Sequence, residues 1–459
     1  MKLTTFLTLA LTFALPSVCL GGQHGVAYGG GWVPGLELVA PFIAMLLAIA
    51  FLPLINDRWD RILPKIFVSC LLGVPVATIV FVQEPARLYH TGLEYFQFLS
   101  LLASLFYLAG GIHLSTNLRA TPRNNTLLLG IGYLLASVVG TTGAAMLMIY
   151  PLLRTNSERR NKMHTVIFFI FLVCNAGGML TPIGDPPLFL GYLKGIDFFW
   201  FLKLIPMWVF NGVLLLASYY GLDIWQYRRE AKQDIQRDDA QIERPRLYGG
   251  LNILFLMVIP TVVALKVPTP YREAIMWGMV CLSMWYQSRS GSATEARERN
   301  GFTWHPIMNV AAVFAGIFMT MIPALVLLEA KGAEFGFTSP AYFFLATGVF
   351  SGFLDNAPTF LVFLAFGQAT MGVPEAAGMM VGNPAVILAA ISSGAVLFGA
   401  ATYIGNAPNL MVKSIVDKRG DIRMPSFFGY MLWSIILIPI FGLSMWLFLE
   451  ALPFPLSLW

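Results

Sequence analysis

One short stretch combines a carboxylic acid with helix-breaking residues in the middle of apolar sequence. It reads TPIGDPPLFL, contains Thr181, Gly184, Asp185 and Pro186, and follows directly after HTVIFFIFLVCNAGGML. Two prolines remove backbone donors and a carboxylate in hydrocarbon is expensive, so an ordinary membrane helix does not explain it. Gly and Pro free backbone polar groups at that depth, which is tolerable only where these groups line a cavity or bind something. The stretch therefore predicts a broken helix at a binding site.

Three further interruptions carry residues of the same kind. TYIGNAPNLM matches the first stretch at its Thr, Ile, Gly and second Pro. SGFLDNAPT breaks a long apolar segment, and SVVGTTGAA lies opposite it when the two halves are aligned, with Thr141 and Thr142 in the places of Asp355 and Asn356. Together they predict one polar site at membrane depth. Its candidate cation- and proton-binding residues are Asp355, Asn356, Asp185 and Asn406, and its candidate supporting residues are Thr141, Thr142, Thr181, Gly184, Pro186, Thr359, Thr402, Gly405 and Asn175.

The residue types restrict what such a site can bind. Carbonyls, Thr hydroxyls, Asn amides and carboxylates suit a hard cation such as sodium, whereas helix N-termini suit an anion. A buried carboxylic acid can also exchange a proton for a cation. The four stretches contain two acids, Asp185 and Asp355, and no Arg or Lys. A di- or tricarboxylate would be expected to use a basic residue in the cavity, so the residues favour a cation.

Composition indicates the setting of this site. Of 459 residues, 57% are hydrophobic and 12% charged, and the mean hydropathy is +0.71. Soluble domains are about a quarter charged, so this is an all-α polytopic membrane protein. The five His and four Cys form no nucleophile–base pair, HExxH helix or CxxC pair. An enzyme, a resident metal and a cofactor are therefore not expected, and the net charge of +5 reflects membrane topology rather than nucleic-acid binding.

The first residues of the chain have the features of a secretory signal. MKLTTFLTLALTFALPSVCLGG has one Lys, a short apolar core and then small residues. This pattern is typical of a cleavable signal peptide, predicted over residues 1–21.

The apolar segment 126–153 is too long for one membrane crossing. A single span needs about 20 residues, and this segment has a polar kink at its centre. Arg119 and Arg123 precede it, Arg154 follows it, and three more basic residues stand before position 163. Because Lys and Arg mark cytoplasmic loops, both flanks are expected inside. A re-entrant hairpin satisfies both flanks, and a single span does not.

The segment 341–367 is also too long for one span, and its flanking residues indicate the opposite side of the membrane. Lys331 precedes it, and the next basic residue is Lys413, so both flanks are expected outside. With two hairpins, most of the 29 basic residues fall in inside loops. Each half of the chain then has three spans, a re-entrant hairpin, a broken span and a last span. Five crossings per half predict two inverted-topology repeats, residues 35–222 and 248–450, joined by a charged cytoplasmic linker over 223–247.

The polar motifs resemble those of a known superfamily. SGFLDNAPTF with AATYIGNAPNL, and NAGGMLTPIGDPPL, are similar to the paired motifs of the ion transporter superfamily. That superfamily includes citrate and dicarboxylate transporters, arsenite permeases and bacterial sodium/proton antiporters. The likeness covers nearly the whole chain after the signal peptide and is greatest to the putative citrate-transport or sodium/proton antiporter branch. It implies a secondary transporter of a small ion in the lipid bilayer, and relatives of this fold are often homodimers.

The resemblance and the acids together predict the activity. Without a basic residue in the motifs, the favoured function is exchange of Na⁺ for H⁺ by alternating access at the midplane site. The alternative is transport of citrate, a dicarboxylate or another anion. The expected location is a bacterial inner membrane, with the N-terminus of the mature chain and the C-terminus in the periplasm.

Overall fold

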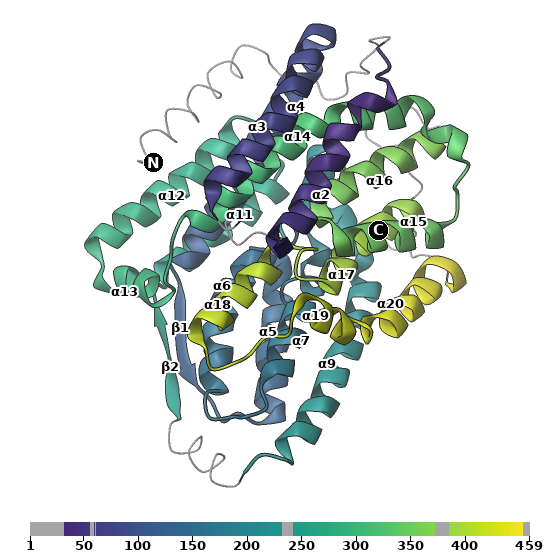
Figure 1. Ribbon diagram of the computed structural model, residues 1–459. Helices are drawn as coiled ribbons and strands as arrows, with labels where there is room; N and C mark the ends of the chain where they lie inside the picture. Colours follow the sequence, from purple (N-terminus) through teal and green to yellow (C-terminus); the bar gives the residue numbers. More distant parts are fainter. Residues whose placement is uncertain (1–31, 56–58, 60, 232–241, 372–384, 453–459) are drawn as a thin grey trace.

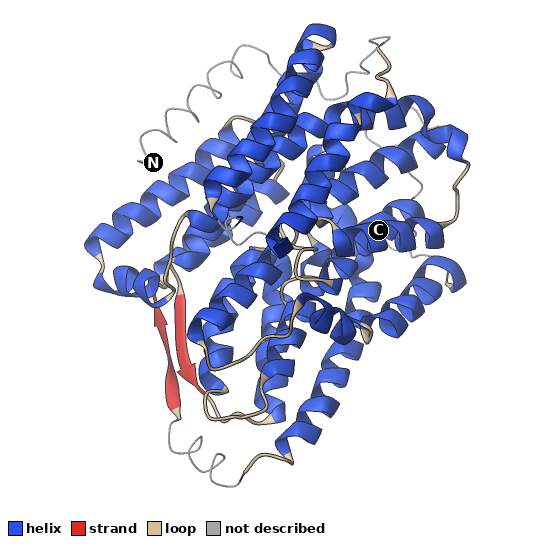
Figure 2. Cartoon of the chain, in the orientation of Figure 1, coloured by secondary structure: helices blue, strands red, loops and turns tan. Residues whose placement is uncertain are grey.

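The computed structural model describes residues 32–55, 59, 61–231, 242–371 and 385–452. The fold is mostly helical, with two strands at one edge (Figure 2). The predicted signal peptide, residues 1–21, lies outside the described residues.

The first half of the chain contains the first broken helix and the first hairpin. Pro122 occupies the first position of α5, where its missing N–H costs nothing, and the Thr121 side chain caps this helix by accepting from Asn124 N. The elements of this half are η2 (Leu36–Leu38), α2 (Ala40–Ile55), α3 (Ile62–Gln83), α4 (Pro85–Gly110), β1 (His113–Asn117), α5 (Pro122–Val139), α6 (Thr141–Thr155), α7 (Met163–Leu172), η4 (Ala176–Leu180), α8 (Pro186–Leu193), η5 (Phe198–Leu204) and α9 (Ile205–Tyr227).

The second half runs through a closely similar order of elements. They are β2 (Glu243–Tyr248), α11 (Leu251–Ala264), α12 (Tyr271–Arg289), α13 (Gly291–Arg299), α14 (His305–Lys331), η6 (Gly332–Phe335), α15 (Pro340–Phe353), α16 (Asn356–Met371), α17 (Ala385–Phe398), η7 (Gly399–Ala401), α18 (Ala407–Arg419), α19 (Phe427–Ser434), α20 (Leu437–Met445) and the π-helical η8 (Trp446–Ala451). In Figure 1, α3 lies beside α14, and α4 packs on both α12 and α14.

Both long apolar segments fold as helical hairpins. In the first, α5 packs on α6, and Gly140 makes the turn with φ of 82°, a conformation that favours glycine. The two ends meet, because Leu118 N donates to Thr155 Oγ1 at 3.3 Å. In the second, α15 packs on α16, and Phe337, before α15, lies 5.9 Å from the Phe366 ring of α16. Neither segment is one long helix, as the hairpin prediction requires, while the membrane side of each hairpin stays a prediction.

Candidate spans are fewer than the ten predicted crossings. One reason is length: the 14 residues of α11 extend about 21 Å, less than the roughly 30 Å hydrocarbon core. Within the described residues, the α19–α20 region forms a pair of helices bent by 46° that counts as one further candidate. In the part of the chain that the structure describes, six helices are long and apolar enough to cross a membrane: Leu36–Pro53, Ile62–Gln83, Pro85–Gly110, Met163–Leu180, Phe198–Tyr227 and His305–Lys331.

A β-ribbon corrects the all-α prediction. β1 and β2 pair antiparallel, with His113 opposite Tyr248 and Ser115 opposite Arg246. Most of β2 lies in the predicted linker 223–247, and α9 continues to Tyr227, inside the same range. In the ribbon, the backbone N–H and C=O groups of the two strands pair with each other. The polarity of either segment alone does not reveal this pairing.

Candidate functional site

The Asp185 carboxylate is the meeting point of the four polar interruptions. It is 0% exposed. Oδ1 accepts from Thr141 Oγ1 at 2.9 Å and from Asn406 Nδ2 at 2.8 Å, and Oδ2 accepts from Asn356 Nδ2 at 2.6 Å. The three donors come from the starts of α6, α18 and α16, and Asp185 itself occupies the N-cap position of α8. The carboxylate thus accepts from donors up to 221 positions away in the sequence.

Four helix N-termini surround this carboxylate. We call the four hydrogen-bonded residues Thr141, Asp185, Asn356 and Asn406 the Asp185 set. Helices α6 and α16 begin at a residue of this set, and α8 and α18 begin directly after one. The first amides of a helix lack intrahelical partners, and the macrodipole gives this end a partial positive charge. Among the described residues, the side chains that donate to Asp185 are neutral. The helix ends therefore supply the positive potential that a buried carboxylate needs.

In the first half, hydrogen bonds from backbone groups and Thr181 fix the broken helix against the hairpin turn. Thr141 N donates to Gly184 O at 2.8 Å. Thr181 Oγ1 donates to Ser137 O at 2.5 Å and accepts from Gly184 N at 3.1 Å. Thr181 is thus a structural bridge between α5 and the segment before α8.

The second half repeats this pattern. Asn356 N donates to Gly405 O at 3.2 Å. Thr402 Oγ1 donates to Gly352 O at 2.6 Å and accepts from Gly405 N at 3.2 Å. Thr402, like Thr181, ties its broken helix to its hairpin.

The matching bonds correct the predicted alignment of the hairpin turns by one residue. Thr141 occupies the place of Asn356, because each donates its backbone N–H to the glycine before the N-cap of a broken helix. Thr142 was expected in that place; it is half-buried and stands one residue outside the set. Asp355 is then matched by Gly140, which has no side chain.

Asp355 lies beside the hydrogen-bonded residues around Asp185, and its carboxylate does not hydrogen-bond to them. Its side chain is partly exposed, and its Oδ1 accepts from Ala357 N at 3.0 Å as the cap of α16. Asn406, a candidate binding residue like Asp355, bonds to Asp185. Thr359 Oγ1 donates to the Asp355 carbonyl at 2.9 Å, and Pro186 fills the first position of α8. From the sequence we expected Asp355 to be the acid that exchanges a proton for a cation, and Asp185 to affect cation affinity or the shape of the broken helix. The structure instead places Asp185 at the centre of the hydrogen bonds.

Glycine at both helix breaks allows backbones to approach closely. A Cβ on Gly184 would stand 2.1 Å from Gly178 O, and one on Gly405 would stand 2.6 Å from Gly399 O. Both clashes are with backbone atoms, which cannot swing away as a flexible side chain could.

Asn175 brings an unpaired acceptor to this region. Its Nδ2 donates to Ile170 O and to Asn409 Oδ1, each at 2.8 Å. Its Oδ1 is fully buried and has no hydrogen-bond partner among the described residues. A Cβ on Gly399 would lie 2.8 Å from this oxygen and 3.4 Å from Asn356 Nδ2, so the oxygen borders the Asp185 set. A buried orphan acceptor is costly and suggests a ligand.

Asn409 is a residue of the site that our sequence reasoning missed. Its Nδ2 donates to Gly399 O at 2.8 Å and to Thr402 O at 2.9 Å, which satisfies carbonyls freed by the break. The signal was present: Asn409 follows Asn406 by three positions in TYIGNAPNLM, the spacing that places two side chains on one helix face.

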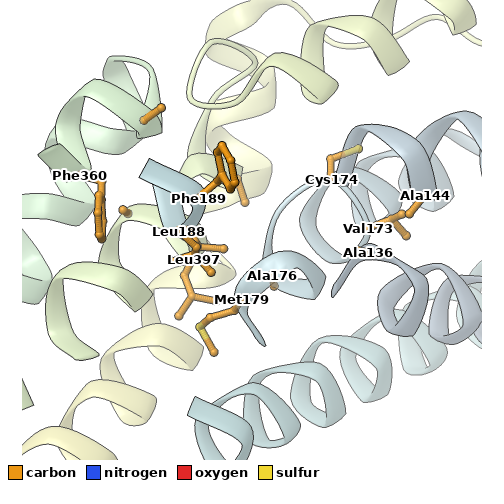
Figure 3. Close-up of a cluster of buried hydrophobic side chains, with 14 of the residues drawn as sticks. Ala136, Ala144, Val173, Cys174, Ala176, Met179, Leu188, Phe189, Phe360 and Leu397 are labelled. Atoms are coloured by element: carbon orange, nitrogen blue, oxygen red, sulfur yellow. The ribbon is translucent and has the colours of Figure 1, made fainter. Parts of the chain in front are cut away.

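Apolar side chains enclose the polar set. Met179 of η4, Leu188 of α8 and Leu397 of α17 lie close together in Figure 3. Thr141, Asn356 and Asn406 are each 1% exposed. In such surroundings, electrostatic interactions are stronger than in water. An ion could reach Asp185 from either side only if the surrounding helices moved, as alternating access requires.

A second buried polar cluster lies in a region where the sequence predicted loops and linker. Asp223 is 0% exposed. It pairs with Arg159 at 2.6 Å, with His164 Nε2 at 2.9 Å and with Tyr219 OH at 3.1 Å. Asp223 was expected in the linker 223–247. The cluster joins the end of the first hairpin to α7 and α9, and nothing in it contacts the Asp185 set.

Comparisons with known proteins identify the family. Residues 33–449 match the family described as "Putative citrate transport". An uncharacterized transporter of Synechocystis sp. is 22% identical over 280 residues, which cover 56% of this chain. The match spans 61% of that relative's length. The chain therefore belongs to the "Putative citrate transport" family of the ion transporter superfamily, a family of transporters and not of enzymes, and it is a multi-pass membrane protein.

Proposed function

We propose that the chain carries a small carboxylate anion of the citrate type, coupled to a cation that binds at Asp185. The observation that carries this proposal is the single buried carboxylate at which four helix N-termini converge. The carboxylate suits the cation, and the helix ends suit the anion. The description of the family favours this function over exchange of cations alone.

The cation half of the proposal rests on oxygen ligands. Asp185 offers its carboxylate, and Asn175 offers a buried, unpartnered amide oxygen nearby. Hard cations take oxygen ligands of these kinds. A proton on Asp185 would neutralise the same charge.

The anion half follows from charge. A polycarboxylate next to an ionised Asp185 would be strongly repelled in low-dielectric surroundings. Once a cation or proton neutralises Asp185, the four positive helix ends face an uncharged centre and attract the anion. Coupling is then a consequence of the geometry, because the anion enters only after the cation.

Exchange of Na⁺ for H⁺ is a second candidate, supported by a different observation. The side chains that donate to Asp185 within the described residues are neutral, and Asp355 lies near enough for the two charges to interact. Two acids without a basic partner can alternate between proton and cation. In this case the helix N-termini only stabilise the ionised acid.

Transport assays in proteoliposomes separate the two candidates. Radiolabelled citrate should accumulate when an inward Na⁺ or H⁺ gradient is imposed, and should not accumulate without one. A pH-sensitive dye inside the vesicles reports Na⁺-driven proton movement in the absence of citrate. Dye response without citrate uptake would replace the first candidate by the second.

We also propose that residues 35–222 and 248–450 are inverted repeats, linked on the cytoplasmic side. The support is the pair of matching hydrogen-bond sets at the two breaks, together with the similar order of elements. The charge asymmetry of the loops gives the orientation.

A further inference from the structure

A basic pocket lies at the other ends of the helices that start at Asp185. Its volume is about 360 Å³, within the range of small-molecule sites. α6 and α18 lie side by side there, next to β1 (Figure 1). The lining residues are His113, Leu114, Ser115, Tyr150, Arg154, Arg299 and Arg419.

The pocket is separate from the Asp185 site. Arg154 is in the last turn of α6, a helix of 15 residues whose first residue is Thr141. At 1.5 Å per residue the pocket is about 20 Å from the Asp185 carboxylate. Arg419 is likewise the last residue of α18. Arg299 and His113 come from α13 and β1, which take no part in the Asp185 set.

Three arginines therefore converge from three helices. A single Arg near a helix C-terminus is ordinary, since it complements the macrodipole. Here three helix ends each contribute an arginine to the lining of one cavity, and a mostly buried His lines it with them. This arrangement goes beyond what capping explains.

Two of these arginines pair with acids that are partly exposed. Arg154 donates to Ser115 Oγ at 3.0 Å as one of its contacts. Arg299 pairs with Glu295 at 2.6 Å, with side chains 38% and 42% exposed. Arg419 pairs with Asp421 at 3.2 Å, with side chains 34% and 32% exposed. Ion pairs of such exposure contribute little to stability, so a ligand carboxylate can replace Glu295 or Asp421 as the partner of the arginine.

We propose that this pocket binds a small anion with two or more carboxylates, at a second site distinct from Asp185. The planar guanidinium fork matches a carboxylate bidentately, and three forks suit a di- or tricarboxylate. Leu114 is the only aliphatic residue in the lining, which does not suit a lipid tail. The choice of a polycarboxylate among small anions rests on the proposed function. The assignment of the pocket as an anion-binding site does not.

Binding here links two groups of elements. Arg154 and Arg419 belong to the helices that carry Thr141 and the Asn406 cap, while Arg299 belongs to α13. An anion held among all three would tie the Asp185 helices to α13 and β1. On the loop charges, this face is the predicted cytoplasmic one.

Calorimetry on the purified full-length chain in detergent tests the proposal, with citrate as the probe. Citrate should bind the wild-type chain. The double variant Arg154→Gln/Arg419→Gln should lose at least tenfold in affinity. Arg423→Gln, on the exposed segment after α18, is the matched control and should bind as wild type does. If the double variant unfolds, Arg299→Gln on short α13 replaces it.

Two results would overturn the proposal. They are unchanged citrate affinity in the arginine variants, and no citrate binding to wild type at millimolar concentration. Inorganic phosphate is the comparison probe, and phosphate binding as tight as citrate binding would overturn the polycarboxylate assignment. Citrate binding at the arginines without citrate uptake in proteoliposomes would contradict the proposed function and still support the anion-binding pocket.

Discussion

At the scale of single residues, Asp185 and Asp355 differ in burial and in the hydrogen bonds that their carboxylates accept. Asp185 accepts three side-chain hydrogen bonds in full burial, whereas Asp355 accepts one backbone bond as a helix cap. Asp185→Asn should therefore reduce cation-driven uptake at least a hundredfold, because it removes the charge that holds the cation. Uptake in proteoliposomes at saturating citrate measures the effect, and thermal unfolding in detergent checks the fold.

Asp355→Asn is the matched control for this prediction. Asn caps a helix about as well as Asp does, so α16 should keep its start. We expect uptake within about threefold of wild type, since the charge at this position is partly exposed and off centre. If Asp355→Asn abolishes coupling and Asp185→Asn spares it, the two acids have been assigned the wrong roles.

His113 makes the arginine pocket sensitive to pH. Its Nδ1 bonds to Asn300 Oδ1 at 2.7 Å, and Asn300 Nδ2 already donates to two carbonyls, so Nδ1 carries the proton and Nε2 accepts when the ring is neutral. Burial, together with the charges of Arg299 and Arg154, lowers the pKa of His113 below 6.5, although the Asn300 bond and the Glu295 charge oppose this. Tyr150 and Tyr248 are the remaining titratable groups whose rings face it.

The sign of the pH effect follows from that lowered pKa. Near pH 7 the ring is neutral, and protonation at lower pH adds a donor and a positive charge. A bound polycarboxylate favours that charged form, so affinity should rise as pH falls below 6.5. His113→Gln should flatten the rise. Citrate titrates too, so calorimetry must compare the variant with wild type at each pH. Identical profiles would exclude His113 from binding.

At the scale of elements, the helix breaks depend on close backbone approach as well as on proline. Gly184→Ala places a methyl group 2.1 Å from Gly178 O, so it cannot simply extend a helix through the break. We expect a lower melting temperature and loss of uptake. Gly221→Ala in α9 is the control, because a Cβ there meets nothing within 4 Å. It should stabilise by up to about 1 kcal/mol. Wild-type stability and uptake in Gly184→Ala would mean that the break is not tightly packed.

Part of this arrangement could be predicted from the sequence. Gly-Asp-Pro-Pro and Gly-Asn-Ala-Pro mark helix breaks because Pro and Gly act locally, and the loop charges favoured the hairpins. Which acid lies at the centre could not be predicted, since it depends on a one-residue register between the halves. The Asp223 cluster was missed for a related reason: its partner Asn125 is 98 positions away. The strands of β1 and β2 pair across more than 100 residues, with no local signal.

At the scale of the whole molecule, the inverted arrangement predicts opposite sides for the two hairpins. The ends of the first hairpin meet in the structure, so Arg119 and Arg160, both exposed, belong to one face. Lys331, also exposed, precedes the second hairpin. If the halves are inverted repeats, the flanks of the second hairpin lie across the membrane from those of the first.

Single cysteines test this arrangement in intact cells and in inverted vesicles. The background chain has Cys70, Cys174 and Cys281 replaced by Ser or Ala, along with the cysteine at position 19. An impermeant maleimide should label Arg119→Cys and Arg160→Cys only in inverted vesicles, and Lys331→Cys only in intact cells. The charge asymmetry sets these sides, and the hairpin fold requires the first two to agree. Labelling of Arg119→Cys and Arg160→Cys from opposite sides would contradict the re-entrant hairpin, because one continuous span would then separate them. Labelling of all three from one side would leave the first hairpin intact and contradict the inverted repeat.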